Sequence, residues 1–509
     1  MNNLSNSFGD SFGYFEGKRG LRQGDPISPL LFVLVMEYLS RVLAKMAKLP
    51  DFRYHPMCKQ QGLTHLVFAD DLMIFCKGQP ASVRRIMEAL GHFTEATGLE
   101  ANVDKSSLYL AGVDDDTKEE ISQITGYAIG SFPIRYPGLP LSPKKWNKLE
   151  CHQLCQKITE KIRTVSTRHL SYAGKLQIIN SVFFSLHNFW GSVFILPQSV
   201  IKEVDKKCRE FLWGSTTEKK KIALVAWEKL CRPKRQGGLN IKGCKIWNMA
   251  AVGKLIWHIM EKKDIMWVKW VQGVYMNNSD DFMNHDPPSD CSWYWKRLNK
   301  LKLQMVNWYV NARYTLTANR QYSVTKGYIQ LIGEAPRWDI AELVWNRVAV
   351  PKHRFILWLA VLGRLLTRVR MQEIGLGCEE NQCVMCADGA AETASHLFSE
   401  CVWTRGIWDS IQGWLGVKVH QREIKEDMQI IKSKHWKRIK KDIAAAVYGA
   451  VIYYTWMARN SMIFQGKNVS RNLVIQQIRN VITERLNIVR DTKRGRKCSS
   501  FIQNVVTSC

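Results

Sequence analysis

Two adjacent aspartates, Asp70 and Asp71, interrupt a mostly apolar run at residues 63–75. Aspartate is unfavourable inside a strand, so the pair indicates a tight turn between two β-arms. Neighbouring carboxylates repel one another, and Mg²⁺, which prefers oxygen ligands, relieves that repulsion. The pair predicts either a metal site at a hairpin tip, of the kind that supports phosphoryl transfer, or a solvated turn without chemistry.

The pattern around this pair mixes strands and helices. Residues 12–17 have the character of a strand, whereas residues 29–48 and 82–98 place apolar residues at helical spacing, with Gly98 as a C-cap. From residue 146 to about residue 213 the periodicity is helical, and the remainder after residue 408 is helical and basic. We therefore expect an α+β protein with an antiparallel sheet and helices in its N-terminal part.

Two apolar runs, at residues 27–39 and 443–456, are shorter than the roughly 18–20 residues that a membrane span needs. Each is also broken by polar or charged residues, so both predict buried helices. We expect no membrane partner.

Charge indicates the class of partner. The 509 residues include 73 Lys and Arg against 45 Asp and Glu, a net charge of +28. This surplus favours a polyanion such as nucleic acid, because each neutralised phosphate releases counterions. A merely basic protein is the alternative. The 14 cysteines form no dense disulfide framework, and the N-terminus shows no secretory signal, so an intracellular, reducing compartment is expected.

Cys383, Cys386, His396 and Cys401 follow the pattern C-x2-C-x9-H-x4-C. Three thiolates and one imidazole close a tetrahedral shell around Zn²⁺ and leave no position for a catalytic water, so such a site would be structural. The alternative is four unconnected thiol and core residues. Cys378 lies outside the pattern and is expected to be a spare thiol.

Two basic runs occur near the C-terminus, at residues 434–441 and 493–497. Either can contact phosphates, and Trp436 can stack on a base. A solvated helix face or a frayed tail explains each run equally well. Most of the 19 tryptophans are expected in the core.

A glycine-rich basic loop at residues 17–32 runs into a helix with prolines in its first turn. This segment resembles motif B of reverse transcriptases, and residues 68–71 (Phe-Ala-Asp-Asp) resemble motif C. Residues 98–106 resemble motif D, and residues 133–142 resemble motif E, the primer grip. With four motifs in the family's order, the chain resembles the C-terminal part of a plant-type non-LTR retrotransposon (LINE-like) reverse transcriptase.

This resemblance implies an RNA-directed DNA polymerase whose partners are RNA, DNA and deoxynucleotides. Asp70 and Asp71 would bind the catalytic Mg²⁺, and Lys105 would donate a proton to the leaving pyrophosphate unless it is an ordinary surface lysine. Pro137 departs from the leucine that is more usual before the glycine of motif E. The residues expected to contact template, incoming nucleotide or primer are Arg22, Gln23, Gly24, Gly138 and Leu139.

Members of the family hold a third carboxylate, the motif A aspartate, tens of residues before motif B, whereas only 23 residues precede Gly24 here. Asp10 matches the hairpin that leads into motif B instead. The fingers region is also missing, so we expect little or no polymerase activity from this chain alone. Supplying that segment in trans, or a longer gene model, would reverse the expectation. The alternatives are a non-catalytic nucleic-acid-binding zinc protein derived from a retrotransposon, and a decayed element with no selected role.

Residues 355–360, 392–398 and 401–403, together with the cysteine pair, resemble the zinc-binding region that follows many plant LINE reverse transcriptases. A nuclear location follows from this resemblance and the run at 493–497, and the oligomeric state is not indicated. The expected domains are a partial polymerase palm (1–145), a helical thumb (146–214), a helical connection (215–350), a zinc-binding domain (351–415) and a basic helical C-terminal region (416–509).

Overall fold

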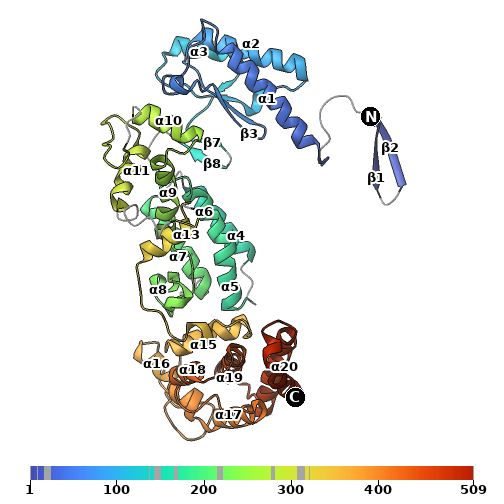
Figure 1. Ribbon diagram of the computed structural model, residues 1–509, viewed down its shortest axis with the longest axis vertical. Helices are drawn as coiled ribbons and strands as arrows, with labels where there is room; N and C mark the ends of the chain where they lie inside the picture. The colour runs from blue at the N-terminus through green and yellow to red at the C-terminus, as the bar shows by residue number, and fades with distance from the viewer. Residues whose placement is uncertain are drawn as a thin grey trace. The chain divides into compact units, whose positions relative to one another are not determined.

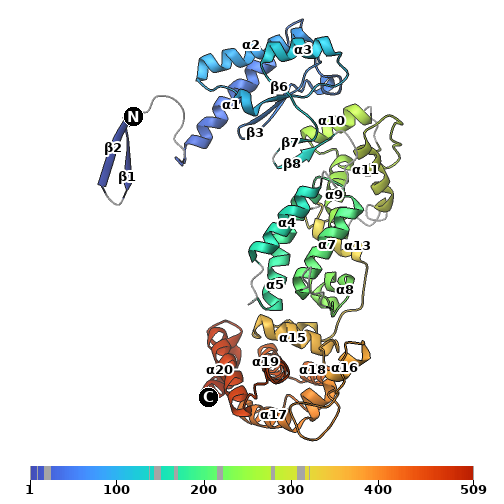
Figure 2. The same ribbon diagram turned by 180° about the vertical axis from the view of Figure 1, so that it is seen from behind.

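The computed structural model of the protein falls into two compact units, each built from two stretches of chain (Figures 1 and 2). Unit 1 comprises Met1–Cys151 and Gly253–Val310, and unit 2 comprises His152–Val252 and Asn311–Cys509. The structure describes residues 2–7, 10–16, 24–136, 138–142, 151–165, 170–214, 222–276, 281–306, 316–319 and 321–507.

Unit 1 contains small sheets and helices. Its elements in chain order are β1 (Asn2–Ser7), β2 (Asp10–Glu16), α1 (Ser28–Met46), η1 (Pro56–Gln61), β3 (His65–Phe68), β4 (Asp71–Ile74), α2 (Pro80–Thr97), η2 (Val103–Lys105), β5 (Ser107–Leu108), α3 (Asp115–Thr125), β6 (Ala128–Ile129), β7 (Ile134–Tyr136), β8 (Leu139–Leu141), α10 (Met266–Tyr275) and α11 (Trp293–Gln304).

The core of unit 1 forms where α1 packs against α2. Leu39 and Leu43 of α1 are buried with Phe52, Ile86 and Phe93. The predicted helix at residues 82–98 is confirmed, and it ends where Gly98 takes the left-handed conformation with φ of +74°.

The first half of α1 contradicts the prediction of a buried helix over residues 27–39. Leu30, Val33 and Leu34 are 67%, 63% and 65% exposed, although Leu39 is only 2% exposed. The physical reason is that the core lies against the C-terminal half of the helix. The apolar face is longer than the surface that covers it.

Four two-stranded sheets are present in the described part of the chain. The pairs β1–β2, β3–β4 and β7–β8 are antiparallel hairpins. The pair β5–β6 is parallel, so the prediction of antiparallel pairing is wrong there. Helix α3 lies between these two strands in sequence and supplies the crossover that a parallel pair requires.

Unit 2 is helical in its described residues. Its elements are α4 (His152–Val165), α5 (Tyr172–Ile178), η3 (Ile179–Phe183), α6 (Phe184–Gly191), α7 (Gln198–Trp213), α8 (Trp227–Cys231), η4 (Lys234–Gln236), α13 (Val324–Ile332), α14 (Ala341–Val344), α15 (Pro351–Val361), α16 (Arg368–Glu373), η6 (His396–Glu400), α17 (Val402–Leu415), α18 (Ile424–Ser433), α19 (Arg438–Gln465), α20 (Arg471–Arg490), η7 (Gly495–Cys498) and α21 (Ser499–Thr507), with α9 (Cys244–Met260) starting in unit 2 and ending in unit 1.

Helix α19 is the centre of the C-terminal part of unit 2, where α15 and α20 pack against it. Its residues from Ile443 to Ile452 are buried, which confirms the predicted buried helix. Gly449 lies at the surface where α19 packs on α15, since a Cβ there would make an ordinary contact of 3.5 Å with Leu357 Cδ2. In the part of the chain that the structure describes, no helix is both long and apolar enough to cross a membrane.

The two stretches of unit 2 pack together through aromatic side chains. Tyr172, at the start of α5, stacks on Phe355 of α15 with ring centroids 5.1 Å apart. The indole N–H of Trp358 donates a hydrogen bond of 2.9 Å to the buried Gly237 carbonyl. Helix α5 begins where the Ser171 hydroxyl accepts the Gly174 N–H.

Candidate metal centres

The two aspartates lie at the tip of a short hairpin. Phe68 at the end of β3 pairs with Asp71 at the start of β4, and only Ala69 and Asp70 connect them. Ala69 has φ of +52°, the left-handed backbone that a tight two-residue turn requires. Both carboxylates are exposed. The hairpin predicted from the sequence therefore forms, and its tip presents oxygen atoms without a covering layer.

A second hairpin, β7–β8, approaches this tip. Burial raises the pKa of Tyr136, at the end of β7, and the negative charge of Asp71 raises it further. Tyr136 pairs with Leu139 across the turn, in which Gly138 has φ of +75°. The structure thus brings the segment expected to grip the primer close to one of the two aspartates.

Of the other predicted polymerase residues, Gly24 and Lys105 occupy exposed positions in unit 1. Lys105 ends η2, where its backbone N–H donates to the Asn102 side chain at 3.1 Å, and its side chain is exposed. Gly24 has φ of +90° and lies just before α1. Arg22 and Gln23 lie outside the described residues.

The Cys383, Cys386, His396 and Cys401 side chains converge in unit 2. One ligand atom from each lies within 4.8 Å of the others. The Cys383 and Cys401 sulfurs are 4.0 Å apart, and Cys386 Sγ lies 3.4 Å from His396 Nε2. Tetrahedral zinc with Zn–S bonds of about 2.3 Å separates sulfur ligands by roughly 3.8 Å. The spacing therefore fits a four-coordinate metal ion, which excludes the alternative of four unconnected residues.

Short local elements position these four ligands. A hydrogen bond of 2.8 Å from the Cys383 N–H to the Ala390 carbonyl closes the loop that carries the cysteine pair. His396 begins η6, and Cys401 follows it as the N-cap of α17. Cys378 is outside the cluster, as predicted, and its thiol donates to the Glu380 carbonyl at 3.0 Å.

The cluster also favours a thiolate, the form that binds metal. The Cys383 thiol donates to the Cys401 sulfur, which lowers the pKa of Cys401 to about 5, and the N–H groups of Trp403 and Thr404 in α17 act in the same direction. The same hydrogen bond and burial raise the pKa of Cys383.

A buried ion pair that was not predicted from the sequence joins the loop of the metal cluster to α19. Arg459 Nη2 lies 2.5 Å from Glu392 Oε1, and the two side chains are 1% and 0% exposed. Glu392 also accepts the Arg368 N–H at 2.9 Å, which fixes the start of α16. A glutamate four residues before His396 was the only hint in the sequence, and it could not indicate a partner 67 residues away.

Comparison with known proteins gives two family matches. Residues 3–170 match the family described as reverse transcriptase (RNA-dependent DNA polymerase), and residues 322–408 match the family described as zinc-binding in reverse transcriptase. The first match contains the aspartate hairpin β3–β4 and the hairpin β7–β8, and the second contains all four residues of the Cys/His cluster.

Among individual relatives, a putative ribonuclease H protein of Arabidopsis thaliana is 34% identical over 137 residues, 27% of this chain and 22% of that protein. A retrovirus-related Pol polyprotein from the type-2 retrotransposable element R2DM of Drosophila melanogaster is 26% identical over 246 residues, 45% of this chain and 21% of that protein. An uncharacterized mitochondrial protein of Arabidopsis thaliana is 30% identical over 89 residues, 17% of this chain and 58% of that protein. The chain thus spans less than two thirds of each of these relatives.

The aspartate hairpin and the Cys/His cluster, with these matches, define a reverse transcriptase region and a zinc-binding region in one chain. Similarity to a retrotransposon polyprotein makes the class more specific. Over the residues that these matches cover, the chain is similar to reverse transcriptases of non-LTR retrotransposons that carry the associated zinc-binding domain.

Proposed function

We propose that the chain contributes the part of an RNA-directed DNA polymerase that holds Mg²⁺ beside the end of a nucleic-acid primer. The observation that carries this proposal is the exposed hairpin tip with Asp70 and Asp71, next to the hairpin of Tyr136. Mg²⁺ bound there would stabilise the negative charge that develops during phosphoryl transfer.

The chain's own residues would orient the reactants around that ion. Gly24, with no Cβ, lets a template or nucleotide approach the backbone before α1. Gly138 and Leu139 would support the primer, and Lys105 would supply a proton to the leaving group. In the described residues no third acidic side chain joins Asp70 and Asp71 in a metal-binding group. We therefore infer that activity needs a further carboxylate besides Asp70 and Asp71.

We also infer that the Cys/His cluster binds Zn²⁺ in a structural role. Its three sulfurs and one imidazole fill a tetrahedral shell, which leaves no coordination site for a reacting water. Metal binding would contribute to folding of the surrounding loops.

Primer extension on an RNA template with Mg²⁺ tests the polymerase proposal. The 509-residue chain alone should give little or no extension, because a metal pair held from one side positions the reactants poorly and orientation contributes about 7–11 kcal/mol to such reactions. Addition of a segment that supplies the missing carboxylate should restore extension in wild type and not in Asp70→Asn. Asp116→Asn, an exposed aspartate at the start of α3, is the matched control. Extension that survives Asp70→Asn contradicts the catalytic assignment.

The alternative, a nucleic-acid-binding zinc protein without catalysis, has one observation in its favour. The Cys/His cluster is already assembled and largely buried, whereas the two aspartates are exposed at their hairpin tip. Salt-dependent RNA or DNA binding with no extension under any of these conditions would support it.

A further inference from the structure

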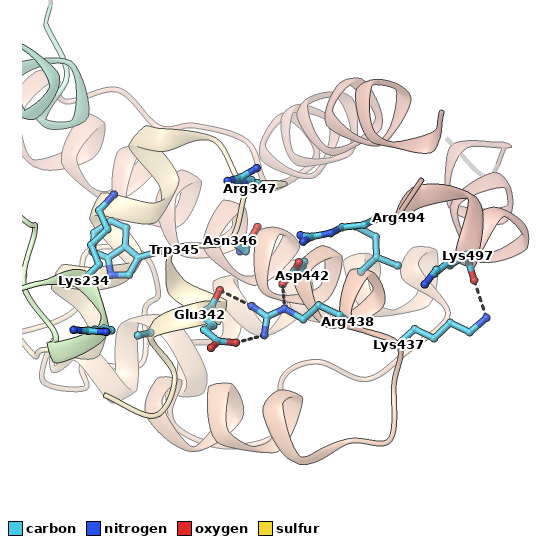
Figure 3. A pocket seen from close by; sticks show the side chains of 13 residues that line it. Lys234, Glu342, Trp345, Asn346, Arg347, Lys437, Arg438, Asp442, Arg494 and Lys497 are labelled. Atoms are coloured by element: carbon cyan, nitrogen blue, oxygen red, sulfur yellow. Dashed lines mark hydrogen bonds and ion pairs between the residues drawn. The ribbon is translucent and has the colours of Figure 1, made fainter. Parts of the chain in front are cut away.

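A pocket of about 820 Å³ in unit 2 is lined mainly by cationic side chains (Figure 3). Seven Lys or Arg residues face two carboxylates, Glu342 and Asp442. The cationic residues come from four separate parts of the unit: η4, Arg347, the start of α19, and the region of η7. Folding therefore concentrates positive charge that is scattered in the sequence.

The two C-terminal basic runs meet at this pocket. Lys437, from the first run, donates through Nζ to the backbone carbonyl of Lys497, from the second, at 2.8 Å. Arg494 lies on the same wall. The prediction of a frayed tail therefore does not describe the second run, because this hydrogen bond ties it to the first, whereas the side chains of Lys437, Arg494 and Lys497 are exposed as the solvated-face alternative predicts.

Most of this charge is not neutralised inside the protein. Arg438 forms ion pairs with both carboxylates of the pocket, with Glu342 and, at 3.0 Å, with Asp442. Arg347, Arg494 and Lys497 are exposed, and none forms an ion pair with a carboxylate of the described residues. Arg347 and Lys497 thus face the pocket without an ion-paired carboxylate among the described residues, whereas Arg494 interacts electrostatically with Asp442.

The basic surface extends beyond this pocket. An adjoining pocket of about 290 Å³ shares Glu342 and Arg438 with it and adds Lys441, Trp436 and Lys432, the last of which forms an ion pair with Asp339 at 3.4 Å. Trp436 lies between Lys434 and Lys440, whose Nζ atoms are 4.8 and 5.0 Å from its ring centroid. The two pockets together hold more cations than a single phosphate group can contact. Cations beside a half-buried indole are the side chains that contact successive phosphates and bases of a nucleic-acid strand.

We propose that this basic pocket, lined by Arg347, Lys437, Arg494 and Lys497, binds the phosphate backbone of single-stranded nucleic acid. It deepens the proposed function by giving the substrate a contact surface far in sequence from the aspartate hairpin. A single strand can enter a hollow and place successive phosphates on its walls, whereas a stiff duplex would touch only the rim. Exposed guanidinium groups are suited to this contact because their planar forks match phosphate oxygens.

Fluorescence anisotropy of labelled single-stranded RNA over a salt series tests the proposal with the double variant Arg347→Ala/Arg494→Ala. The slope of log K against log salt should fall by about 1.4, and affinity near 0.1 M salt should drop on the order of tenfold, if each arginine neutralises one phosphate. The control Lys425→Ala/Lys467→Ala removes two exposed cations of unit 2 outside the pocket and should bind as wild type does. The double variant Arg347→Lys/Arg494→Lys keeps both positive charges and should therefore retain most of the slope of log K against log salt.

Cross-linking wild-type chain to 4-thiouridine RNA gives a second readout that does not depend on a variant folding. Cross-linked peptides should include residues 342–347 or 494–501. An unchanged slope in the double alanine variant, an equal loss in the control, or cross-links elsewhere would overturn the proposal. If the double alanine variant lost as much affinity for duplex RNA as for single-stranded RNA, the proposed preference for single strands would be overturned. No RNA binding by wild type would instead count against the proposed function itself.

Discussion

Cys386 and Cys378 lie eight residues apart and have different surroundings. Cys386 Sγ is 3.4 Å from His396 Nε2, whereas Cys378 donates to a backbone carbonyl. We expect Cys386→Ser to lose most bound zinc and Cys378→Ser to keep one ion per chain, because only the first removes a ligand. Elemental analysis of the purified variants measures this difference.

Hydrogen exchange gives the structural side of the same prediction. Exchange across residues 375–410 should accelerate in Cys386→Ser and after chelation of wild type, since metal binding and folding are coupled in small sites. A full zinc equivalent in Cys386→Ser, or protection unchanged by chelation, would contradict the assignment of the cluster as a zinc site.

Glu392 and Arg459 connect the loop of the Cys/His cluster to helix α19. Arg459→Met would leave the Glu392 carboxylate buried without its cation, which costs about 3–5 kcal/mol in known buried pairs. The matched control is Arg41→Met, which breaks an exposed pair with Glu37 on α1 and should cost less than about 1 kcal/mol. Urea unfolding, followed by a probe in unit 2 for Arg459 and in unit 1 for Arg41, compares the two costs. Equal losses would show that the buried pair has no special role.

Local elements followed from the sequence because local chemistry determines them. The aspartate hairpin and the Gly98 cap of α2 both depend on residues within a few positions. The spacing of the four metal ligands belongs to the same category, since their loop is closed by short-range hydrogen bonds.

Features that depend on distant partners could not be predicted. The apolar stripe of α1 gave no sign that only its C-terminal half would be covered. The parallel pairing of β5 with β6 depends on how α3 folds back, and the Glu392–Arg459 pair on where α19 lies. The meeting of the two basic runs is of this kind too, because it requires η7 to pack beside the start of α19. The polymerase roles of individual residues remain predictions.

Two histidines make the stability of unit 2, the larger part of the molecule, depend on pH. Burial lowers the pKa of His187 to about 4 and that of His353 to about 3. Because an unfolded histidine titrates near 6.5, these groups contribute stability that is fully present above pH 6.5 and decreases as the pH falls toward 4. Each should account for a loss of about 2 kcal/mol between pH 6.5 and pH 5.

His353→Phe isolates one of these contributions. The ring of His353 lies 4.4 Å from that of Tyr453, and neither of its nitrogens has a hydrogen-bond partner among the described residues, so phenylalanine removes the titration and little else. The difference in unfolding free energy between pH 7 and pH 5 should shrink by about 2 kcal/mol in this variant. A pH dependence identical to that of wild type would rule out a buried neutral histidine.

Unit 1 is assembled from stretches that are far apart in the chain. Gln61 at the end of η1 donates to the Lys269 carbonyl at 3.2 Å, and Trp270 of α10 donates to the Met57 carbonyl at 2.9 Å. The fold of this unit is therefore complete only when residues 253–310 are available.

This order has a consequence during translation. The first stretch leaves the ribosome well before the second, and about 100 residues at roughly 5–20 residues per second take on the order of 5–20 seconds to synthesise. Throughout that interval the surface of η1 that later receives α10 stays open to water and to neighbouring nascent chains. Premature aggregation on the polysome, rather than equilibrium unfolding of the finished protein, is the hazard that this topology creates.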